Sequence, residues 1–254
     1  MSADEEIRAS SVLPADRRAL EIVTGDGLRL IGELALPCAA DPEATLVCVH
    51  PLPTHGGMMD SHVLRKASWR LPALARIGVL RFNTRGTTSA AGTSEGSFDE
   101  ARSEGRDLDA AIAVARDHGL PRIWLLGWSF GCDVILKRGP VPGIDGVILV
   151  SPALRYTTAD ELGRWSGAGI PLVCLIPEND DYLQPPEARE RFGSVPEAEI
   201  VVGEGAGHLW VGEPYVRMVL DEVAGRLTDT RPLPDSWPAA RAASEGPMER
   251  WSDL

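Results

Sequence analysis

Hydrophobic positions along the chain follow two kinds of pattern, which alternate from about residue 45 onward. Segments 45–50, 78–82 and 122–126 are apolar at nearly every position, as is typical of short strands covered on both faces. In segment 98–118 apolar residues recur instead at the spacing of one helix face. The alternation of strands with helices predicts a mostly parallel sheet connected by right-handed crossovers.

The first two predicted strands, at 19–23 and 28–36, are joined differently. They flank Asp26 and Gly27, a dipeptide that favours a tight hairpin turn. The sequence therefore predicts a doubly wound α/β domain of about eight strands, entered through an antiparallel N-terminal hairpin. Further strands are predicted at 146–150, 171–176 and 198–202, and helices at 61–77, 98–118, 130–138 and 214–227.

The chain of 254 residues is long enough to bury one sizeable core. We predict a polar N-terminal segment at 1–18, one α/β domain at 19–227 and a Pro-rich tail at 228–254. Trp237 and Trp251 are the largest apolar residues of that tail. It is either a mobile tail or an arm that docks these tryptophans on its own domain or on a second subunit, so a homo-oligomer stays open.

The formal net charge of −12 argues against nucleic acid or an anionic membrane surface as a partner. The first residues lack the basic start and apolar core of a secretory leader, and no apolar stretch is long enough to span a bilayer. The four cysteines lie far apart without a Cys-x-x-Cys pair, which gives no support for a zinc or redox site. We therefore expect a cytoplasmic protein with free, buried thiols.

Ser129 lies between Gly127 and Gly131 in a Gly-x-Ser-x-Gly frame, directly after the strand predicted at 122–126. A buried strand, a tight turn and a helix together form a nucleophile elbow, which lifts one hydroxyl above the edge of a sheet. Small residues on both sides allow strand and helix to approach closely. The alternative is a strand-to-helix turn that contains a serine by chance.

A serine nucleophile needs a histidine base and an acid that orients it. His208 follows the last predicted strand in a Gly-rich loop, where it can reach the same sheet edge as Ser129. The acid is expected after the strand at 171–176, in a loop with three carboxylates. Asp180 is preferred there, Asp181 is second and Glu178 is third.

The order Ser129, Asp180, His208 resembles that of α/β-hydrolases, and the resemblance covers about 19–227. Segment 50–57 resembles the oxyanion-hole loop of that family, and 81–86 with Gly92 and Gly96 resembles its fourth-strand loop. Segment 177–185 resembles the acid loop, except that Pro177 stands where the family has glycine, which leaves Asp181 open. The chain is similar to compact dienelactone-hydrolase-like or serine-aminopeptidase-like members, although dienelactone hydrolases use cysteine as nucleophile.

The resemblance implies an oxyanion hole formed by the backbone N–H groups of Phe130 and Leu52. Trp128, Trp210 and His50 are candidates for lining the substrate pocket. Core packing is the alternative for the two tryptophans, and fixing the oxyanion loop is the alternative for His50. Only 153–170 occupies the interval in which related proteins insert a lid, so no large lid domain is expected.

These features predict a serine hydrolase, esterase- or thioesterase-like, that cleaves a small-molecule carboxylic ester or thioester through an acyl-enzyme. Neither a metal nor a cofactor is expected. The alternative is a non-hydrolytic protein of the same fold, acting as a biosynthetic cyclase or rearrangement catalyst or as a small-molecule binder.

Overall fold

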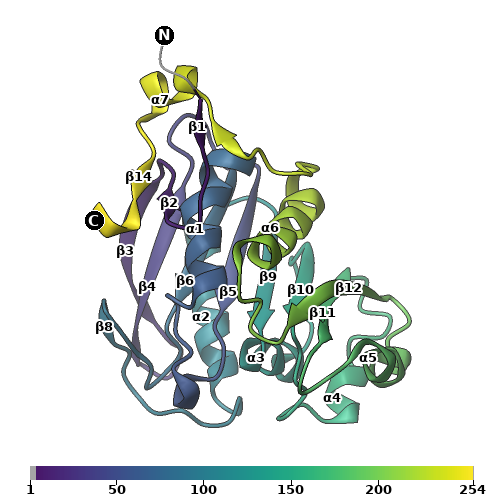
Figure 1. The fold of residues 1–254 in the computed structure, drawn as a ribbon. Coiled ribbons are helices and arrows are strands. Elements are labelled where there is room, and N and C mark those ends of the chain that lie inside the picture. The colour runs from purple at the N-terminus through teal and green to yellow at the C-terminus, as the bar shows by residue number, and fades with distance from the viewer. Residues whose placement is uncertain (1–3, 254) are drawn as a thin grey trace.

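The computed structural model describes residues 4–253 and is built around a mixed sheet of eight strands (Figure 1). The strands lie across the sheet in the order β12 (Ala198–Gly207), β11 (Leu172–Asn179), β10 (Gly146–Val150), β9 (Ile123–Trp128), β5 (Ala44–Val49), β6 (Ile77–Phe82), β4 (Arg29–Leu36) and β3 (Asp16–Val23). Strand β4 is antiparallel to both β3 and β6, and the other neighbours are parallel. This confirms the predicted sheet and its N-terminal hairpin.

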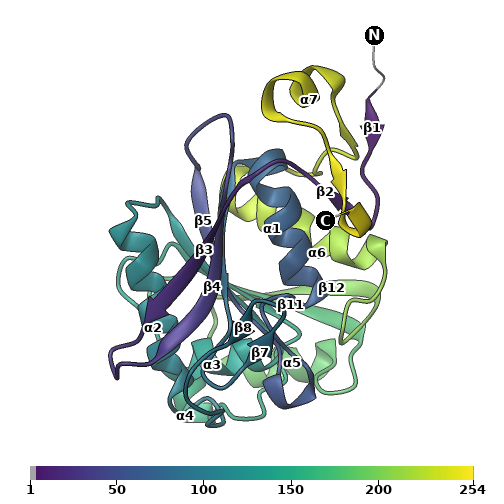
Figure 2. The ribbon, with the colours of Figure 1, turned by 90° about the vertical axis from the view of Figure 1, so that its left-hand side faces the viewer.

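Helices cover both faces of the sheet (Figure 2). One face is covered by α1 (His62–Ala75) and α6 (Glu213–Thr228), and the other by α2 (Glu104–Asp117), α3 (Phe130–Arg138), α4 (Ala159–Gly163) and α5 (Pro185–Arg191). Strand β5 is buried along its whole length. Its Leu46 and Cys48 pack toward α1 and α6, whereas Val47 and Val49 pack toward α2 and α3. The apolar runs in the sequence follow from this two-sided burial.

The start of α2 differs from the prediction. We expected a helix from residue 98, but α2 begins at Glu104 because Glu100 and Ala101 adopt positive φ angles of 55° and 61°. The Glu104 carboxylate accepts a hydrogen bond from the Asp99 N–H, which fixes this turn before the helix. Helical spacing in the sequence does not reveal such a turn.

The interval 153–170 contains only α4, of five residues, which confirms the expected absence of a large lid domain. Helix α5 was not predicted; it begins with Pro185 at its first position, where proline is well tolerated. Other short elements are the hairpin of β7 (Thr88–Ser89) and β8 (Gly92–Thr93) and the 3₁₀ turns at Pro53–His55, Phe192–Ser194 and Trp251–Asp253.

The segment after α6 folds back onto the beginning of the chain (Figure 1). Strand β13 (Ser236–Trp237) pairs with β1 (Glu5–Glu6), and β14 (Glu249–Arg250) pairs with β2 (Ser11–Val12), with α7 (Ala239–Glu245) between them. Trp237 is buried, and the Trp251 ring lies 4.4 Å from the Arg65 guanidinium of α1. The segment is thus an arm docked on its own chain rather than a mobile tail. A role for it in a homo-oligomer stays a prediction.

Three further findings concern membrane helices, metal-ligand groups and cysteines. Within residues 4–253, no helix has the length and hydrophobicity needed to cross a membrane. The same residues contain no group of three or more His, Cys, Asp or Glu side chains arranged to hold a metal ion. All four cysteines are free, and Cys38 is exposed, contrary to the expectation of buried thiols.

Candidate active site

Ser129 occupies the turn between β9 and α3, with φ 52° and ψ −110°. Few non-glycine residues adopt such a positive φ, and the strain persists only where the surrounding structure holds it. The Ser129 N–H donates to the Val150 carbonyl at 2.8 Å, and the Ser129 carbonyl accepts from the Cys132 N–H at 2.9 Å. These two bonds fix the backbone on both sides of a partly exposed side chain.

The glycines of the frame are required by close contacts. A Cβ on Gly131 would lie 2.2 Å from the Val49 carbonyl oxygen, and one on Gly127 would lie 2.6 Å from the Gly131 carbonyl carbon and oxygen. The helix α3 therefore begins almost in contact with β5 and β9. This close approach places Ser129 at the carboxyl edge of the sheet.

His208 and Asp180 lie next to Ser129. The His208 Nε2 atom is 2.9 Å from the Ser129 Oγ atom, and His208 Nδ1 is 2.9 and 3.0 Å from the two carboxylate oxygens of Asp180. Asp180 is 2 % exposed and His208 is 9 % exposed. The structure therefore brings the three predicted triad residues into one hydrogen-bonded chain.

The partners of the histidine determine its tautomer. A carboxylate only accepts hydrogen bonds, so the imidazole proton belongs on Nδ1, and the lone pair on Nε2 faces the serine hydroxyl. The Asp180 carboxylate also accepts from the Tyr182 N–H at 2.8 Å and from the Leu183 N–H at 3.2 Å. The acid is thus held by its own loop, in the orientation that a serine–histidine pair needs.

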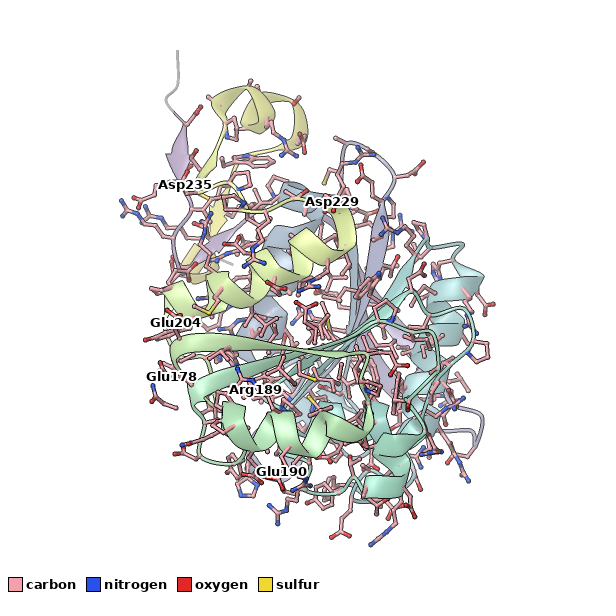
Figure 3. The ribbon with its side chains drawn as sticks, turned by 90° about the vertical axis from the view of Figure 1, so that its right-hand side faces the viewer. Glu178, Arg189, Glu190, Glu204, Asp229 and Asp235 are labelled. Atoms are coloured by element: carbon pink, nitrogen blue, oxygen red, sulfur yellow. The ribbon has the colours of Figure 1, made fainter. Side chains whose placement is uncertain are left out.

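The other two candidate acids lie elsewhere. Asp181 is exposed, and among residues 4–253 the carboxylate that bonds to His208 is that of Asp180; Glu178 accepts a hydrogen bond from the Gly205 N–H at 2.7 Å. Figure 3 shows Glu178 and Glu204 at the surface, near the ends of β11 and β12. Of the three carboxylates in the loop, only Asp180 reaches the histidine.

Two backbone N–H groups near the serine have no acceptor among the residues that the structure describes. They belong to Phe130 and Leu52, the two predicted oxyanion donors. Leu52 precedes a 3₁₀ turn in which its carbonyl accepts from the N–H groups of His55 and Gly57. A Cβ on Gly57 would lie 2.1 Å from the Pro51 carbonyl oxygen, so only glycine permits this compact loop.

His50 fixes the Leu52 loop and does not line a pocket, which decides between the two interpretations of this residue. It is fully buried; its Nε2 accepts from the Thr84 N–H at 3.0 Å, and its Nδ1 lies 2.6 Å from the Pro51 carbonyl oxygen. Burial lowers the pKa of His50 to about 4, so the ring is neutral near pH 7. A neutral ring with its proton on Nδ1 satisfies both contacts.

Residues on the next strand end also hold this loop, and the sequence did not reveal them as site residues. The Asn83 side-chain oxygen accepts from the Met59 N–H at 2.9 Å. The buried Arg81 guanidinium donates to the Met59 carbonyl at 3.0 Å and to the Asp60 carboxylate at 2.6 Å. Both residues lie in segment 81–86, which was singled out only by its resemblance to a family loop.

Trp128 and Trp210 do not line the surface around Ser129, which corrects the pocket interpretation. Each is 1 % exposed and belongs to the core between the sheet and helices α1 and α6. The Trp128 ring meets the His62 ring edge-on, with centroids 5.1 Å apart. The two indole rings therefore pack in the core next to the elbow and do not contact substrate.

Other aromatic rings flank the site instead. The exposed Tyr182 ring lies against the His208 ring, with centroids 4.5 Å apart. On the other side, Phe98 and Tyr156 pack on the ring of Phe130, with centroids 5.3 and 5.9 Å away, and both are partly exposed. Sequence reasoning missed Tyr182 and Phe98, although each lies in a loop that follows a predicted strand.

Cys132, three residues after the serine, is excluded as an alternative nucleophile by its surroundings. Its Sγ donates to the Gly127 carbonyl at 3.1 Å, and the residue is fully buried. Burial raises the pKa of this thiol well above its ordinary value, so the reactive thiolate does not form near pH 7.

Solved structures with the same arrangement of elements were found, although no protein-family model and no curated protein matches the chain. An α/β serine hydrolase homologue from Coxiella burnetii has a TM-score of 0.67 and 23 % sequence identity, covering 82 % of this chain and 96 % of its own. A lidless α/β serine hydrolase from Xanthomonas campestris has a TM-score of 0.63 and 26 % identity, covering 86 % and 94 %. This chain has the α/β-hydrolase fold.

A third structural neighbour is an esterase from Pyrococcus furiosus, with a TM-score of 0.68 and 19 % identity over 84 % of this chain and 92 % of the esterase. The shared fold explains why an elbow serine, an acid after one strand and a histidine after the next meet at one edge. In α/β-hydrolases this edge is formed by the carboxyl ends of the parallel strands.

Proposed function

We propose that this protein is a serine hydrolase that cleaves a carboxylic ester or thioester through an acyl-enzyme intermediate. The observation that carries the proposal is the hydrogen-bonded chain from Ser129 through His208 to Asp180. Serine hydrolase homologues and an esterase among the structural neighbours support the same reaction class. A binding protein would have no need of a base and an oriented acid beside a strained serine.

The first half of the reaction forms the acyl-enzyme. Ser129 Oγ attacks the carbonyl carbon of the ester while His208 Nε2 takes the hydroxyl proton. Asp180 stabilises the imidazolium through its contacts with Nδ1. The developing oxyanion binds the N–H groups of Phe130 and Leu52, and one such donor is worth about 10²–10³-fold in rate. His208 then gives its proton to the leaving alcohol or thiol.

The second half releases the acid. A water molecule loses a proton to His208 Nε2 and attacks the acyl-enzyme, and the same two N–H groups hold the oxyanion again. His208 returns the proton to Ser129 Oγ as the acid departs. All the proton transfers in this scheme pass through one ring nitrogen, which faces the serine in the structure.

The proposal is tested by labelling the protein with a fluorophosphonate probe, which forms a covalent bond with an activated serine. We expect the wild type to be labelled and Ser129→Ala to remain unlabelled, because the Ser129 Oγ atom lies 2.9 Å from the Nε2 atom of its histidine base. Mass spectrometry of the modified peptide identifies the labelled residue. An unlabelled wild-type protein of intact fold would contradict the proposal and favour the non-hydrolytic alternative.

The surroundings of the serine favour a small-molecule ester with an apolar group. No lid covers the site, and the partly exposed rings of Phe98 and Tyr156 form an apolar wall beside the Phe130 donor. An acyl group that packs on this wall gains about 0.8 kcal/mol for each buried methylene. We therefore propose that the acyl group lies against Phe98 and Tyr156.

Replacing Tyr156 with alanine tests this acyl wall. We expect kcat/KM for p-nitrophenyl butyrate to fall about 5–10-fold, because the lost ring contributes on the order of 1 kcal/mol of apolar contact. Hydrolysis of the acetate ester changes less, since its acyl group is too short to reach far along the wall. Trp251→Ala, which removes an exposed aromatic ring from the docked arm, is the control and leaves the ratio of the two esters unchanged. An equal loss for both esters would argue against the wall.

A further inference from the structure

A second chain of hydrogen bonds lies behind the catalytic histidine. The Trp210 indole N–H donates to the Ser151 hydroxyl oxygen at 2.8 Å, and the Ser151 hydroxyl donates to the His208 backbone carbonyl at 2.9 Å. Ser151 is the first residue after β10 and is 1 % exposed. No step of the proposed reaction uses this serine, and it touches none of the reacting atoms.

The direction of each bond in this chain follows from chemistry. An indole N–H can only donate, and a carbonyl oxygen can only accept. The Ser151 hydroxyl must therefore accept from Trp210 and direct its own proton at His208. Bonds arranged head to tail in a buried site polarise one another and strengthen the chain. The hydroxyl is thus fully satisfied by the loop that carries the histidine.

Two residues of this hydrogen-bond chain also have strained backbone conformations. Ser151 has a φ of 49° and Trp210 a φ of 50°, close to the 52° of Ser129. Such a conformation is unfavourable for a residue other than glycine and persists only where the surrounding structure holds it. Three strained non-glycine residues around one histidine indicate that the position of this loop is strongly determined.

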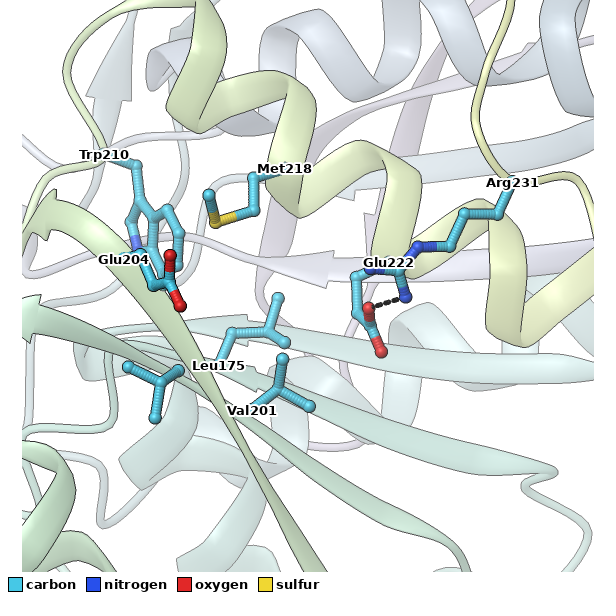
Figure 4. A pocket seen from close by; sticks show the side chains of 9 residues that line it. Leu175, Val201, Glu204, Trp210, Met218, Glu222 and Arg231 are labelled. Carbon is cyan, nitrogen blue, oxygen red and sulfur yellow. Dashed lines mark hydrogen bonds and ion pairs between the residues drawn. The ribbon is translucent and has the colours of Figure 1, made fainter.

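The indole of Trp210 is held from its other side by the edge of the sheet. A Cβ on Gly203 of β12 would lie 2.4 Å from the Trp210 ring, so the glycine makes room for the indole. Figure 4 shows Trp210 at one end of a cavity between β12 and α6, with Leu175 and Met218 nearby. The ring therefore spans from this cavity to Ser151.

We propose that Ser151 is a positioning residue that sets where His208 presents its Nε2 atom. This inference rests on the proposed hydrolase function. Asp180 fixes the imidazole ring only at Nδ1, whereas Ser151 fixes the backbone from which the ring extends. The Trp128 indole N–H also points at the His208 carbonyl, but at 3.5 Å it is a weaker donor. Loss of the Ser151 hydroxyl leaves the carbonyl without its strong donor, and the 2.9 Å contact between Nε2 and Ser129 Oγ loosens.

The experiment compares Ser151→Ala and Ser151→Gly with wild type, using p-nitrophenyl acetate. We expect both variants to lower kcat about 10–100-fold with KM within about twofold, since a misplacement of about 1 Å can cost about 10²-fold. Glycine relieves the strain at φ 49° and alanine does not, so Ser151→Gly melts at the higher temperature. If the two variants lose kcat equally although their melting temperatures differ, the loss comes from the missing hydroxyl and not from lower stability. Trp210→Phe, which removes the indole donor together with part of a buried ring, keeps the Ser151 hydroxyl and lowers kcat less.

Ser68→Ala is the matched control. Ser68 is also fully buried; its hydroxyl donates to Glu33 at 2.8 Å and accepts from Arg17 at 2.8 Å, but it lies on α1 away from the triad. We expect this variant to lose stability and to keep its kcat. A purely structural role for Ser151 predicts the same result for Ser151→Ala, and that result would overturn the proposal.

An independent measurement separates this proposal from that of the hydrolase. The backbone N–H of Trp210 donates to the Gly207 carbonyl at 2.9 Å, within the loop that carries His208. We expect its hydrogen exchange to be about tenfold faster in Ser151→Ala than in wild type or Ser68→Ala. If wild type is inactive, this exchange rate still decides whether Ser151 holds the loop, and unchanged exchange refutes the proposal. Loss of wild-type activity in Ser129→Ala decides the hydrolase function separately.

Discussion

Replacing His208 with alanine is expected to lower kcat for p-nitrophenyl acetate by about 10⁴-fold or more, the range found when a triad base is removed. His208 is the only histidine in residues 4–253 that contacts the Ser129 hydroxyl, so no other ring can take its proton. KM should change little, because the imidazole acts mainly in the transition state. Steady-state kinetics measures both quantities.

His118→Ala is the control for this loss. His118 bonds to the Val114 carbonyl at 2.8 Å at the end of α2, is exposed, and should leave kcat unchanged. Asp180→Asn and Asp181→Asn extend the test to the acid. The first should cost about 10³–10⁴-fold in kcat because the asparagine can hold the wrong tautomer, and the second should cost less than about twofold. The reverse order would assign the acid role to Asp181.

Replacing Gly131 with alanine is expected to destabilise the fold by at least about 3 kcal/mol, a large effect for a single methyl group. The added Cβ would lie 2.2 Å from the Val49 carbonyl oxygen, which belongs to the backbone of the central strand β5 and cannot rotate away. Helix α3 would have to move, and the turn at Ser129 would move with it. Urea unfolding followed by circular dichroism gives the change in the free energy of unfolding.

Gly163→Ala is the matched control for this substitution. Gly163 ends α4, and a Cβ there meets no atom within 4 Å. We expect its free energy of unfolding to stay within about 0.5 kcal/mol of wild type. Equal stability of Gly131→Ala and Gly163→Ala would show that α3 can shift without cost, contrary to the close contact seen in the structure.

The sequence predicted the sheet and the three triad candidates for a topological reason. Ser129, Asp180 and His208 each follow a different strand, and parallel strands bring such residues to one edge. The sequence favoured Asp180 over Asp181 as the triad acid, but which of two neighbouring residues faces the histidine depends on how the loop turns. In the structure that turn is fixed by the N–H groups of Tyr182 and Leu183, which both donate to Asp180.

The residues that the sequence did not reveal act through packing and through turns. Burial decides that Trp128 and Trp210 belong to the core, and an aromatic residue beside a triad member gives no sign of which way it faces. Ser151 carries no signal in the sequence, because its role depends on bonds to two residues of a distant loop. Helix α2 begins late because of two left-handed residues, which helical spacing does not encode.

The arm that joins β13 and β14 to β1 and β2 has a consequence for synthesis. On the ribosome the N-terminal strands emerge first, but their partners are made only after the whole central sheet. Glu5 and Ser11 therefore pair with Trp237 and Arg250 only after the elements of the catalytic edge have emerged. A chain stalled between α6 and β13, at residues 229–235, would carry every triad residue and still leave both N-terminal strands without partners.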